Sequence, residues 1–280
     1  MEKRAFGKTG EKLSVAGFGG MLVMQEPQAT ADRMVAEAVE KGINYFDVAP
    51  TYGDAEEKLA AALLPHRKSV FLACKTAERS AKGAEKELTQ SLKRFKTDRL
   101  DLYQLHAVNT AEELGEVLAP GGALEFLLKA KQRGLLRFLG FSSHHEHSAL
   151  ALFDSFAFDS CMFPLNFFCW HYAGLGKKLV KKAAEKGAGL NALKTLAKTK
   201  RPAGKYEKWN KCWYEPLVQP EDIKLAVRFT LSLPVTSALS SSHEELFKLQ
   251  CEASNNALPL TEAEEAFLKN KYAGLEPLFK

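Results

Sequence analysis

Short apolar runs alternate with amphipathic segments along almost the whole chain, and this alternation constrains the fold more than any other feature. The runs are bounded by glycine, proline or polar residues, which is typical of buried strands. The segments between them place apolar residues at helical spacing, as Ala31, Met34, Val35 and Ala38 do. Eight strands are predicted, at residues 15–19, 44–46, 70–75, 100–105, 137–142, 161–164, 189–193 and 235–240.

The predicted helices follow the strands in turn and lie at 30–41, 55–64, 84–95, 124–133, 145–156, 176–186, 220–233, 242–254 and 261–272. Gly42 ends the first of them and Pro65 ends the second. Thr261 and Glu264 form a capping box at the start of the last helix. Residues 3–15 alternate loosely around a glycine-containing turn, which predicts a small β-hairpin over one end of the fold.

The alternation of strand and helix favours a single (β/α)8 TIM barrel of the α/β class, with an N-terminal β-hairpin cap and an extra C-terminal helix. The chain of 280 residues is long enough for one such barrel, and no low-complexity linker divides residues 1–280 into two domains. The competing fold is an open doubly wound sheet. Its G-x-G-x-x-G fingerprint is missing from the first glycine turn, so the barrel is favoured.

Composition and charge narrow the class of protein. Hydrophobic residues make up 46% of the chain and charged residues 26%, as in soluble globular proteins, and no apolar run is long enough to span a membrane. The first residues lack the apolar region of a secretory signal, and the five cysteines form no Cys-x-x-Cys pair. We therefore expect a cytoplasmic protein with reduced thiols, no membrane partner and a monomeric or weakly oligomeric state.

A basic segment lies at residues 194–211, where seven lysines or arginines face the single acid Glu207. A solvated loop is the simplest interpretation of such a charge run. A nucleic acid is not expected as a partner, because the net charge of +5 is modest and the chain lacks supporting basic or aromatic features elsewhere. A third interpretation is a loop that folds over a polyanionic cofactor and becomes ordered when the cofactor binds.

Polar side chains stand at the carboxyl ends of three consecutive predicted strands, where α/β folds place their chemistry. Asp47, Lys75 and His106 each end one strand, and Tyr52 lies in the loop that follows Asp47. Neighbouring parallel strands lie about 4.8 Å apart, so these side chains are expected to converge at the mouth of the barrel. Each residue alone has a structural explanation, such as a turn, a solvated lysine or a structural histidine. Together they favour an acid–base site.

The pattern Asp-x-Ala-x-x-Tyr-Gly at residues 47–53 resembles the signature of the aldo-keto reductases, and Lys75 and His106 match the family's remaining catalytic positions in order. This resemblance implies reduction of an aldehyde or ketone, a small-molecule carbonyl substrate, by hydride transfer from NAD(P)H. It implies that Tyr52 is the general acid, that Lys75 lowers the pKa of Tyr52, and that Asp47 is the partner of Lys75. His106 would orient the substrate oxygen.

The resemblance also implies a set of cofactor-binding residues at or after the strand ends: Gly20, Ser142, Ser143, Met162, Leu193, Lys194, Ser240, Ser241 and Ser242. Several differ from the family, which has asparagine in place of Ser143, glutamine in place of Met162 and a stacking tyrosine in place of Leu193. The three serines after the last strand replace a basic clamp on the 2′-phosphate, although a helix N-terminus still suits phosphate.

The resemblance favours NADP(H), with NAD(H) as the alternative. Neutral serine hydroxyls at the 2′-phosphate predict a preference for NADPH that is modest, because each neutral hydrogen bond contributes only about 0.5–1.5 kcal/mol. His243 stands at the start of the same predicted helix and would add charge only when protonated. The preference is therefore predicted to shrink as the pH rises through the titration of His243.

Other groups of residues have competing interpretations. His144, His145 and His147 suggest a metal site, but their spacing suits a helix start and no cysteine lies near them, so no metal is expected. Six aromatic residues are expected either in the core or in an apolar substrate pocket: Phe167, Phe168, Trp170, Trp209, Trp213 and Tyr214. A rival hypothesis for the whole chain is a nucleotide-binding barrel with weak turnover, acting as a redox sensor or accessory subunit, and the altered cofactor positions support it.

Overall fold

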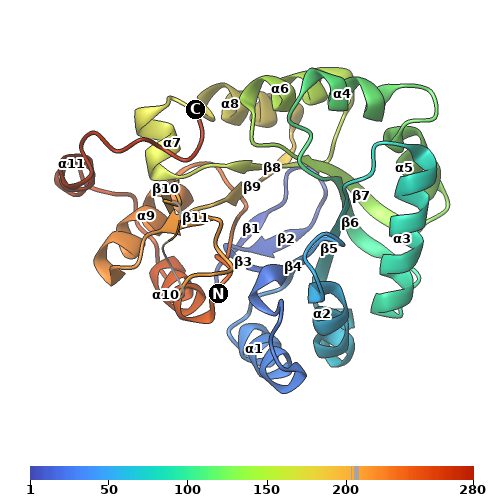
Figure 1. Ribbon diagram of the computed structural model, residues 1–280, viewed down its shortest axis with the longest axis horizontal. Coiled ribbons are helices and arrows are strands. Elements are labelled where there is room, and N and C mark those ends of the chain that lie inside the picture. The colour runs from blue at the N-terminus through green and yellow to red at the C-terminus, as the bar shows by residue number, and fades with distance from the viewer. Residues whose placement is uncertain (203, 205–207) are drawn as a thin grey trace.

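Eight parallel strands form a closed barrel surrounded by helices in a computed structural model, which describes residues 1–202, 204 and 208–280 (Figure 1). The strands follow one another around the barrel as β3 (Ala16–Gly19), β4 (Tyr45–Asp47), β5 (Phe71–Thr76), β6 (Leu100–Leu105), β7 (Leu136–Ser142), β8 (Ser160–Pro164), β9 (Gly189–Leu193) and β12 (Ser237–Leu239). β12 pairs in parallel with both β9 and β3, which closes the sheet on itself. The (β/α)8 barrel predicted from the sequence is confirmed.

The nine predicted helices are all present, each within three residues of the expected ends. They are α1 (Gln28–Glu40), α2 (Ala55–Leu63), α3 (Ala81–Phe95), α5 (Ala123–Gln132), α6 (Glu146–Ser155), α8 (Lys177–Lys186), α9 (Pro220–Ser232), α10 (Glu244–Ser254) and α11 (Glu262–Lys271). α11 is the extra C-terminal helix, and the Thr261 hydroxyl accepts the backbone N–H of Glu264 at 3.2 Å, as the capping box predicted. None of the described helices is both long and apolar enough to cross a membrane.

Two short helices were not predicted, α4 (Ala111–Leu118) and α7 (Phe167–Tyr172). α4 begins with a complete capping box, in which the Thr110 hydroxyl accepts the N–H of Glu113 and the Glu113 carboxylate accepts the N–H of Thr110. This signal is present in the sequence, and Leu114, Val117 and Leu118 lie at helical spacing, so local patterns were sufficient to predict α4. α7 is buried along half its length, so no alternation of polar and apolar residues marks its period.

The N-terminal hairpin forms as predicted and closes the amino-terminal end of the barrel. β1 (Lys3–Ala5) pairs antiparallel with β2 (Lys12–Ser14). Phe6 and Leu13 are buried and belong to the apolar cluster inside the barrel, where the ring of Phe6 lies 5.6 Å from that of Phe71 between centroids. The hairpin therefore fills the end of the barrel opposite the candidate site.

Alternation along each strand decides which side chains point into the barrel. In β5, Phe71 and Ala73 belong to the apolar cluster inside the barrel, whereas Leu72 and Cys74 belong to the cluster between strands and helices. Lys75 continues the inward series. The same period carries the polar residues at the ends of β4 and β6 inward, so these side chains meet above an apolar interior.

The basic segment 194–211 is not a simple loop. β10 (Ala197–Lys200) lies within it and pairs antiparallel with β11 (Tyr214–Pro216), which follows it. Three of its lysines form ion pairs with acids outside the segment: Lys198 with Glu215, Lys208 with Glu245, and Lys211 with Glu26. Lys205 and Glu207 lie outside the described residues. These acids neutralise part of the charge of the segment, and its ordering on cofactor binding stays a prediction.

Candidate active site

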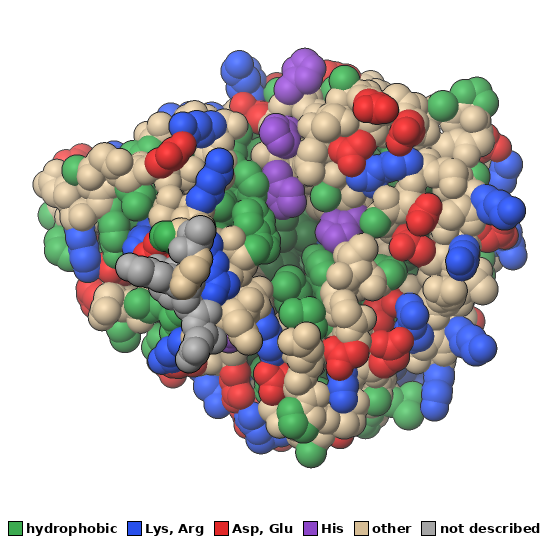
Figure 2. All heavy atoms as spheres, viewed as in Figure 1, with side chains coloured by type: hydrophobic (Ala, Val, Ile, Leu, Met, Phe, Trp, Pro, Cys, Tyr) green, Lys and Arg blue, Asp and Glu red, His purple; other side chains and the backbone are tan. Residues whose placement is uncertain are grey.

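The four predicted catalytic residues lie together at the carboxyl ends of the barrel strands. Asp47 ends β4, Lys75 is the penultimate residue of β5, and His106 directly follows β6. Tyr52 belongs to the loop between β4 and α2. Figure 2 shows a hollow at the centre of the barrel face, bordered by apolar side chains and by histidines.

The Lys75 ammonium is buried and forms an ion pair with the Asp47 carboxylate. It also donates to the backbone oxygen of Val48 at 3.2 Å. Burial alone would lower the pKa of Lys75, yet the pKa is raised because the Asp47 carboxylate stabilises the ammonium. The lysine is therefore charged at neutral pH, and its Nζ lies 5.4 Å from the centroid of the Tyr52 ring.

A chain of hydrogen bonds holds the Asp47 carboxylate inside the barrel. Gln104 Nε2 donates to Asp47 Oδ2 at 2.9 Å, and the Tyr45 hydroxyl donates to the same oxygen at 3.4 Å. Asn191 Nδ2 donates in turn to the Tyr45 hydroxyl at 3.1 Å. A buried carboxylate needs such donors, because its desolvation is costly. Sequence reasoning did not assign these three residues to the site, and the signal that could have found them was the inward phase that Gln104 shares with His106.

Gln104→Leu is expected to lower kcat about tenfold. The Asp47 carboxylate loses a hydrogen bond that holds it in place beside Lys75, and a bond to a charged group contributes about 1.5–3 kcal/mol. Tyr45→Phe removes the longer bond to the same oxygen and should have the smaller effect. Steady-state rates of both variants check the prediction, and a wild-type kcat in Gln104→Leu would contradict it.

Tyr52 is half-buried, and opposing influences act on its hydroxyl. Burial raises the pKa of Tyr52, the charge of Lys75 lowers it, and the net result is a raised pKa. Lys75 thus acts in the direction expected from the sequence, but burial is the larger effect. Tyr52 therefore keeps its proton at neutral pH, which a general acid requires.

The ring of His106 meets the ring of Tyr52 edge to face, with 5.7 Å between their centroids. Burial, followed by the positive charge of Lys75, lowers the pKa of His106 to about 3. The imidazole is therefore neutral at neutral pH and carries one N–H donor. A neutral donor, a phenol and a buried ammonium are thus in place around one position that a carbonyl oxygen could occupy.

The two serines at the end of β7 form hydrogen bonds within the protein's own loops. Ser142 Oγ accepts the N–H of Ala107 at 2.8 Å, and Ser143 Oγ donates to the backbone oxygen of His145 at 3.1 Å. Asn109 Oδ1 lies 3.4 Å from Ser143 Oγ, so an asparagine side chain stands beside the position where the resemblance implied one. The Ser142 hydroxyl donates to no other described residue, so its hydrogen is available for a ligand. Ser143 instead stabilises the start of α6.

Three other predicted cofactor residues shape the strand ends. Met162 is buried in the apolar cluster inside the barrel, and Leu193 packs against the same cluster. Gly20 begins a 3₁₀ helix, η1 (Gly20–Leu22), and a Cβ there would lie 2.6 Å from Cγ2 of Val48. Packing against the end of β4 therefore requires this glycine, whether or not a ligand approaches it.

The serines after β12 leave room for a ligand with oxygen acceptors. Ser240 Oγ accepts a backbone N–H of β3 at 2.8 Å, and Ser242 Oγ lies 3.8 Å from Met21 Sδ. Ser241 is buried and its hydroxyl has no hydrogen-bond partner within the described residues, and the same holds for Thr195 after β9. Two buried hydroxyls without partners at neighbouring strand ends fit the phosphates of a dinucleotide.

His243 is not a free cation at the N-terminus of α10. Its Nε2 accepts the N–H of Lys211 at 3.2 Å, and burial lowers the pKa of His243 below its ordinary value. Three basic side chains near this helix end are already paired with acids: Arg33 with Glu244, Lys208 with Glu245 and Lys211 with Glu26. A fourth, Arg201, donates to the backbone oxygens of Trp209 and Cys212. A 2′-phosphate at this end of the helix would therefore meet neutral donors first.

The six aromatic residues expected in the core or in a substrate pocket divide unevenly. Phe167, Phe168, Trp209 and Tyr214 are buried, and Trp170 packs against Phe229 of α9. Trp213 is 49% exposed, and its ring meets the ring of His144 edge to face at 6.5 Å between centroids. The core interpretation is thus confirmed for five of them, and Trp213 stays a candidate for the wall of a pocket.

The histidine triplet lies at the start of α6, as its spacing predicted. The ring of His144 stacks on the ring of Phe279 near the C-terminus, with 4.9 Å between centroids and 14° between planes. Burial, and then the charge of Lys194, lowers the pKa of His144 to about 4. Over the ranges 1–202 and 208–280, no three His, Cys, Asp or Glu side chains lie close enough to hold a metal ion.

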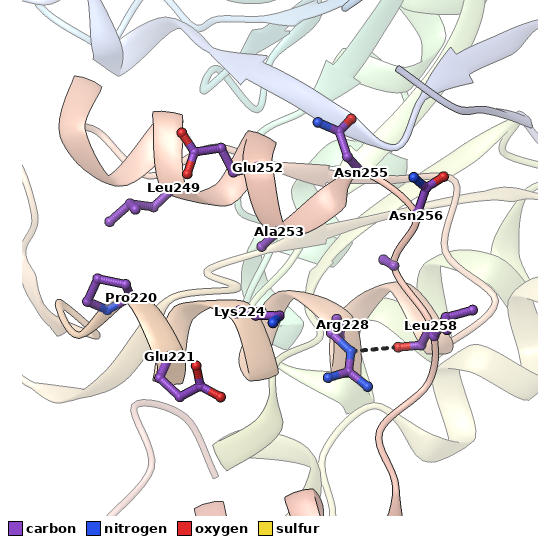
Figure 3. A pocket seen from close by; sticks show the side chains of 11 residues that line it. Pro220, Glu221, Lys224, Arg228, Leu249, Glu252, Ala253, Asn255, Asn256 and Leu258 are labelled. Carbon is purple, nitrogen blue, oxygen red and sulfur yellow. Dashed lines mark hydrogen bonds between the residues drawn. The ribbon is translucent and has the colours of Figure 1, made fainter.

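A separate groove of about 560 Å³ lies between α9 and α10, away from the barrel mouth (Figure 3). Lys224, Leu249 and Leu258 are among its lining residues. Arg228 also lines it, and Arg228 Nε donates to the backbone oxygen of Leu258 at 2.9 Å (Figure 3). None of the strand-end residues described above lines it, so the mouth of the barrel is the candidate active site.

A family model and curated proteins match parts of this chain. A model of the aldo/keto reductase family matches residues 16–216, well over half of the chain. The oxidoreductase YqkF of Bacillus subtilis is 32% identical over 157 residues, which are 51% of this chain and 49% of that protein. L-galactose dehydrogenase of Arabidopsis thaliana is 32% identical over 155 residues, 50% of this chain and 48% of that protein. The chain thus spans about half the length of the curated relatives it matches.

Solved structures share the fold over almost the whole chain. An aldo-keto reductase from Bacillus halodurans in its holo form is 23% identical, with a TM-score of 0.74 and 96% of each chain covered. A thermostable aldo-keto reductase in complex with the inhibitor epalrestat is 20% identical, with a TM-score of 0.73 and coverage of 96% of this chain and 99% of that one. The family model spans residues 16–216, which include Asp47, Tyr52, Lys75 and His106, and the chain belongs to the aldo/keto reductase family.

Proposed function

We propose that the protein reduces an aldehyde or ketone to an alcohol by hydride transfer from a nicotinamide dinucleotide. The observation that carries the proposal is the buried Lys75–Asp47 ion pair beside Tyr52, with a neutral His106 against the same phenol. Membership of the aldo/keto reductase family supports it. Carbonyl reduction needs a proton donor and a hydrogen-bond donor at the oxygen, and this group of residues can provide both.

In this proposal Tyr52 transfers the proton and its neighbours stabilise the charges that result. Tyr52 holds a proton at neutral pH and would donate it to the carbonyl oxygen as negative charge develops there. The Lys75 ammonium would stabilise the phenolate that remains, and Asp47 keeps that ammonium charged and in place. Because His106 is neutral, it can orient the oxygen with its N–H without adding a second cation beside Lys75.

A reduced nicotinamide dinucleotide, when bound, supplies the hydride. We propose that its binding uses the buried hydroxyls of Ser142, Ser241 and Thr195 together with the N-terminus of α10, because these donors are available for oxygen acceptors. The remaining predicted positions shape the strand ends around it: Gly20, Ser143, Met162, Leu193, Ser240 and Ser242.

A screen of aldehydes and ketones with purified protein tests the proposal. The absorbance of NADPH or of NADH is followed over time with each compound. For at least one compound, we expect the cofactor to be oxidised faster than in the absence of any carbonyl compound. Cofactor binding is measured in parallel by quenching of protein fluorescence. Tight cofactor binding without consumption for any aromatic, aliphatic or sugar aldehyde would contradict the proposal.

That contrary result would favour the rival function, a nucleotide-binding barrel with weak turnover that acts as a redox sensor or accessory subunit. Met162 and Leu193 favour the rival, because neither can form the polar or stacking contacts that the family has at these positions. In either case we propose that residues 1–280 act as one domain, in the cytoplasm, as a monomer or weak oligomer.

NADPH is expected to bind modestly more tightly than NADH, by a factor that changes little between about pH 6 and about pH 8. Neutral hydrogen bonds to the 2′-phosphate contribute about 0.5–1.5 kcal/mol each. The sequence predicted a factor that shrinks with rising pH, but burial lowers the pKa of His243 and its Nε2 already accepts the N–H of Lys211, so its protonation is disfavoured. Fluorescence-quenching titrations of both reduced cofactors measure the ratio, and a ratio that falls steeply as the pH rises would restore the original expectation.

A further inference from the structure

Lys194 directly follows β9 at the mouth of the barrel and has a left-handed backbone conformation, with φ of 60°. Its Nζ lies 5.1 Å from the centroid of the Trp213 ring and 5.2 Å from that of the Tyr214 ring. Both rings come from the start of β11 and the residue before it. Cation–π attraction to two rings fixes the ammonium at this position instead of leaving it to extend into water.

No carboxylate forms an ion pair with this ammonium in the part of the chain that the structure describes. In this respect Lys194 differs from three other lysines of the same basic segment, which are paired: Lys198, Lys208 and Lys211. Burial, with the like charge of Lys75 adding to it, lowers the pKa of Lys194 to about 8. Lys194 is thus a partly buried cation that faces two aromatic rings and no described carboxylate.

Lys194 lies beside His144 at the mouth of the barrel, because the Trp213 ring that its Nζ faces at 5.1 Å also meets the ring of His144 edge to face at 6.5 Å between centroids. The charge of Lys194 contributes to the lowered pKa of His144, which agrees with this position. The charge of Lys75 is balanced by Asp47. Lys194 therefore contributes a positive charge without a described carboxylate partner at the mouth of the barrel.

Aromatic rings surround the approach to Lys194. The ring of Phe279 stacks on that of His144 and meets that of Trp213 edge to face, at 5.8 Å between centroids. These rings come from the loop after β7, the residue before β11 and the C-terminal end of the chain. A flat apolar ligand can pack against such rings while an anionic group reaches the ammonium.

We infer that the mouth of the barrel binds a carbonyl substrate that carries a carboxylate, with the carboxylate on Lys194 and the apolar part against Trp213 and Phe279. This inference rests on the proposed function and narrows its substrate class. The carboxylate balances the charge that the protein leaves unpaired. A cofactor phosphate is the competing ligand, but Lys194 lies over the Trp213 ring beside His144, whereas the Ser241 hydroxyl without a described partner supplies a phosphate position after β12.

The test compares benzaldehyde with 4-carboxybenzaldehyde in the wild type, Lys194→Met and Lys177→Met. Lys177 is the matched control, because its Nζ also lies over a tryptophan ring, 5.8 Å from the centroid of Trp170, but on the exposed surface of α8. Lys194→Met is expected to raise KM for 4-carboxybenzaldehyde on the order of tenfold or more, as loss of a charge-assisted contact does. KM for benzaldehyde should change much less, and Lys177→Met should behave as wild type with both aldehydes.

A binding measurement separates this inference from the proposed function. Tryptophan fluorescence reports on the mouth through Trp213 and gives the Kd of both aldehydes without turnover. Tighter binding of the carboxylated aldehyde to wild type, lost in Lys194→Met, supports the inference even where no carbonyl compound is reduced. Equal losses for both aldehydes, or no loss, would overturn it. Weaker NADPH binding with unchanged discrimination between the aldehydes would also overturn it and would assign Lys194 to a cofactor phosphate.

Discussion

Tyr52→Phe is expected to reduce kcat on the order of 10²-fold or more, as loss of a general acid does, while cofactor binding stays nearly intact. The substitution removes the phenol proton beside the Lys75 charge and keeps the ring that packs edge to face against His106. The geometry of the site is therefore preserved while the proton donor is lost. Steady-state turnover and cofactor titration of the same preparation measure the two effects.

Tyr172→Phe is the matched control for this substitution. The hydroxyl of Tyr172 donates to the backbone oxygen of Lys269 at 3.1 Å, outside the barrel mouth, so its removal tests for a general effect of losing a phenol. The control should keep wild-type turnover. Wild-type turnover in Tyr52→Phe itself would remove Tyr52 from the proposed mechanism.

Lys75→Met is expected to have two large effects. Turnover should fall on the order of 10²- to 10⁴-fold, because the charge that stabilises the phenolate is lost. The free energy of unfolding should fall by about 3–5 kcal/mol, because Asp47 is left as a buried charge without its partner. Burial and the charge of Asp47 raise the pKa of Tyr52, and in this variant the positive charge of Lys75 no longer opposes them. The alkaline limb of the residual pH–rate profile should therefore move to higher pH.

The double variant Lys75→Met/Asp47→Asn separates the two effects. It removes both charges, so chemical denaturation should show that much of the lost stability returns, because no uncompensated buried charge remains. Turnover should stay low, since no ammonium faces Tyr52. If the single and double variants are equally stable, the ion pair does not have the energetic role assigned to it here.

The polar residues of the site could be predicted because each follows a strand whose period and boundaries are local. Asp47, Lys75 and His106 end β4, β5 and β6 in one inward phase, and the parallel order of these strands brings them together. Gln104 shares this phase, but an inward amide gives no sign of which carboxylate it bonds. Its role as a donor to Asp47 became visible once the register of neighbouring strands was known.

The basic segment 194–211 shows the opposite case. Its sequence reads as a run of unpaired positive charge, yet Lys211 reaches Glu26 and Lys198 reaches Glu215. These acids lie outside the segment, and one of them lies near the other end of the chain. Counting charges in a local window therefore overestimated the unpaired charge. It also could not distinguish Lys194, which forms no ion pair with a described residue, from Lys198 and Lys211, which do.

Local patterns in the sequence were sufficient for the order of strands and helices, the barrel and the four residues of the proposed acid–base group, since periodicity, turn residues and caps act over a few neighbouring positions. Burial and long-range pairing were not accessible in this way, because they depend on groups brought together by folding. Burial raises the pKa of Tyr52 against the pull of Lys75, and it keeps His106 neutral. The stack of Phe279 on His144 likewise joins the C-terminal end to the loop after β7, a contact that no local pattern in either segment could specify.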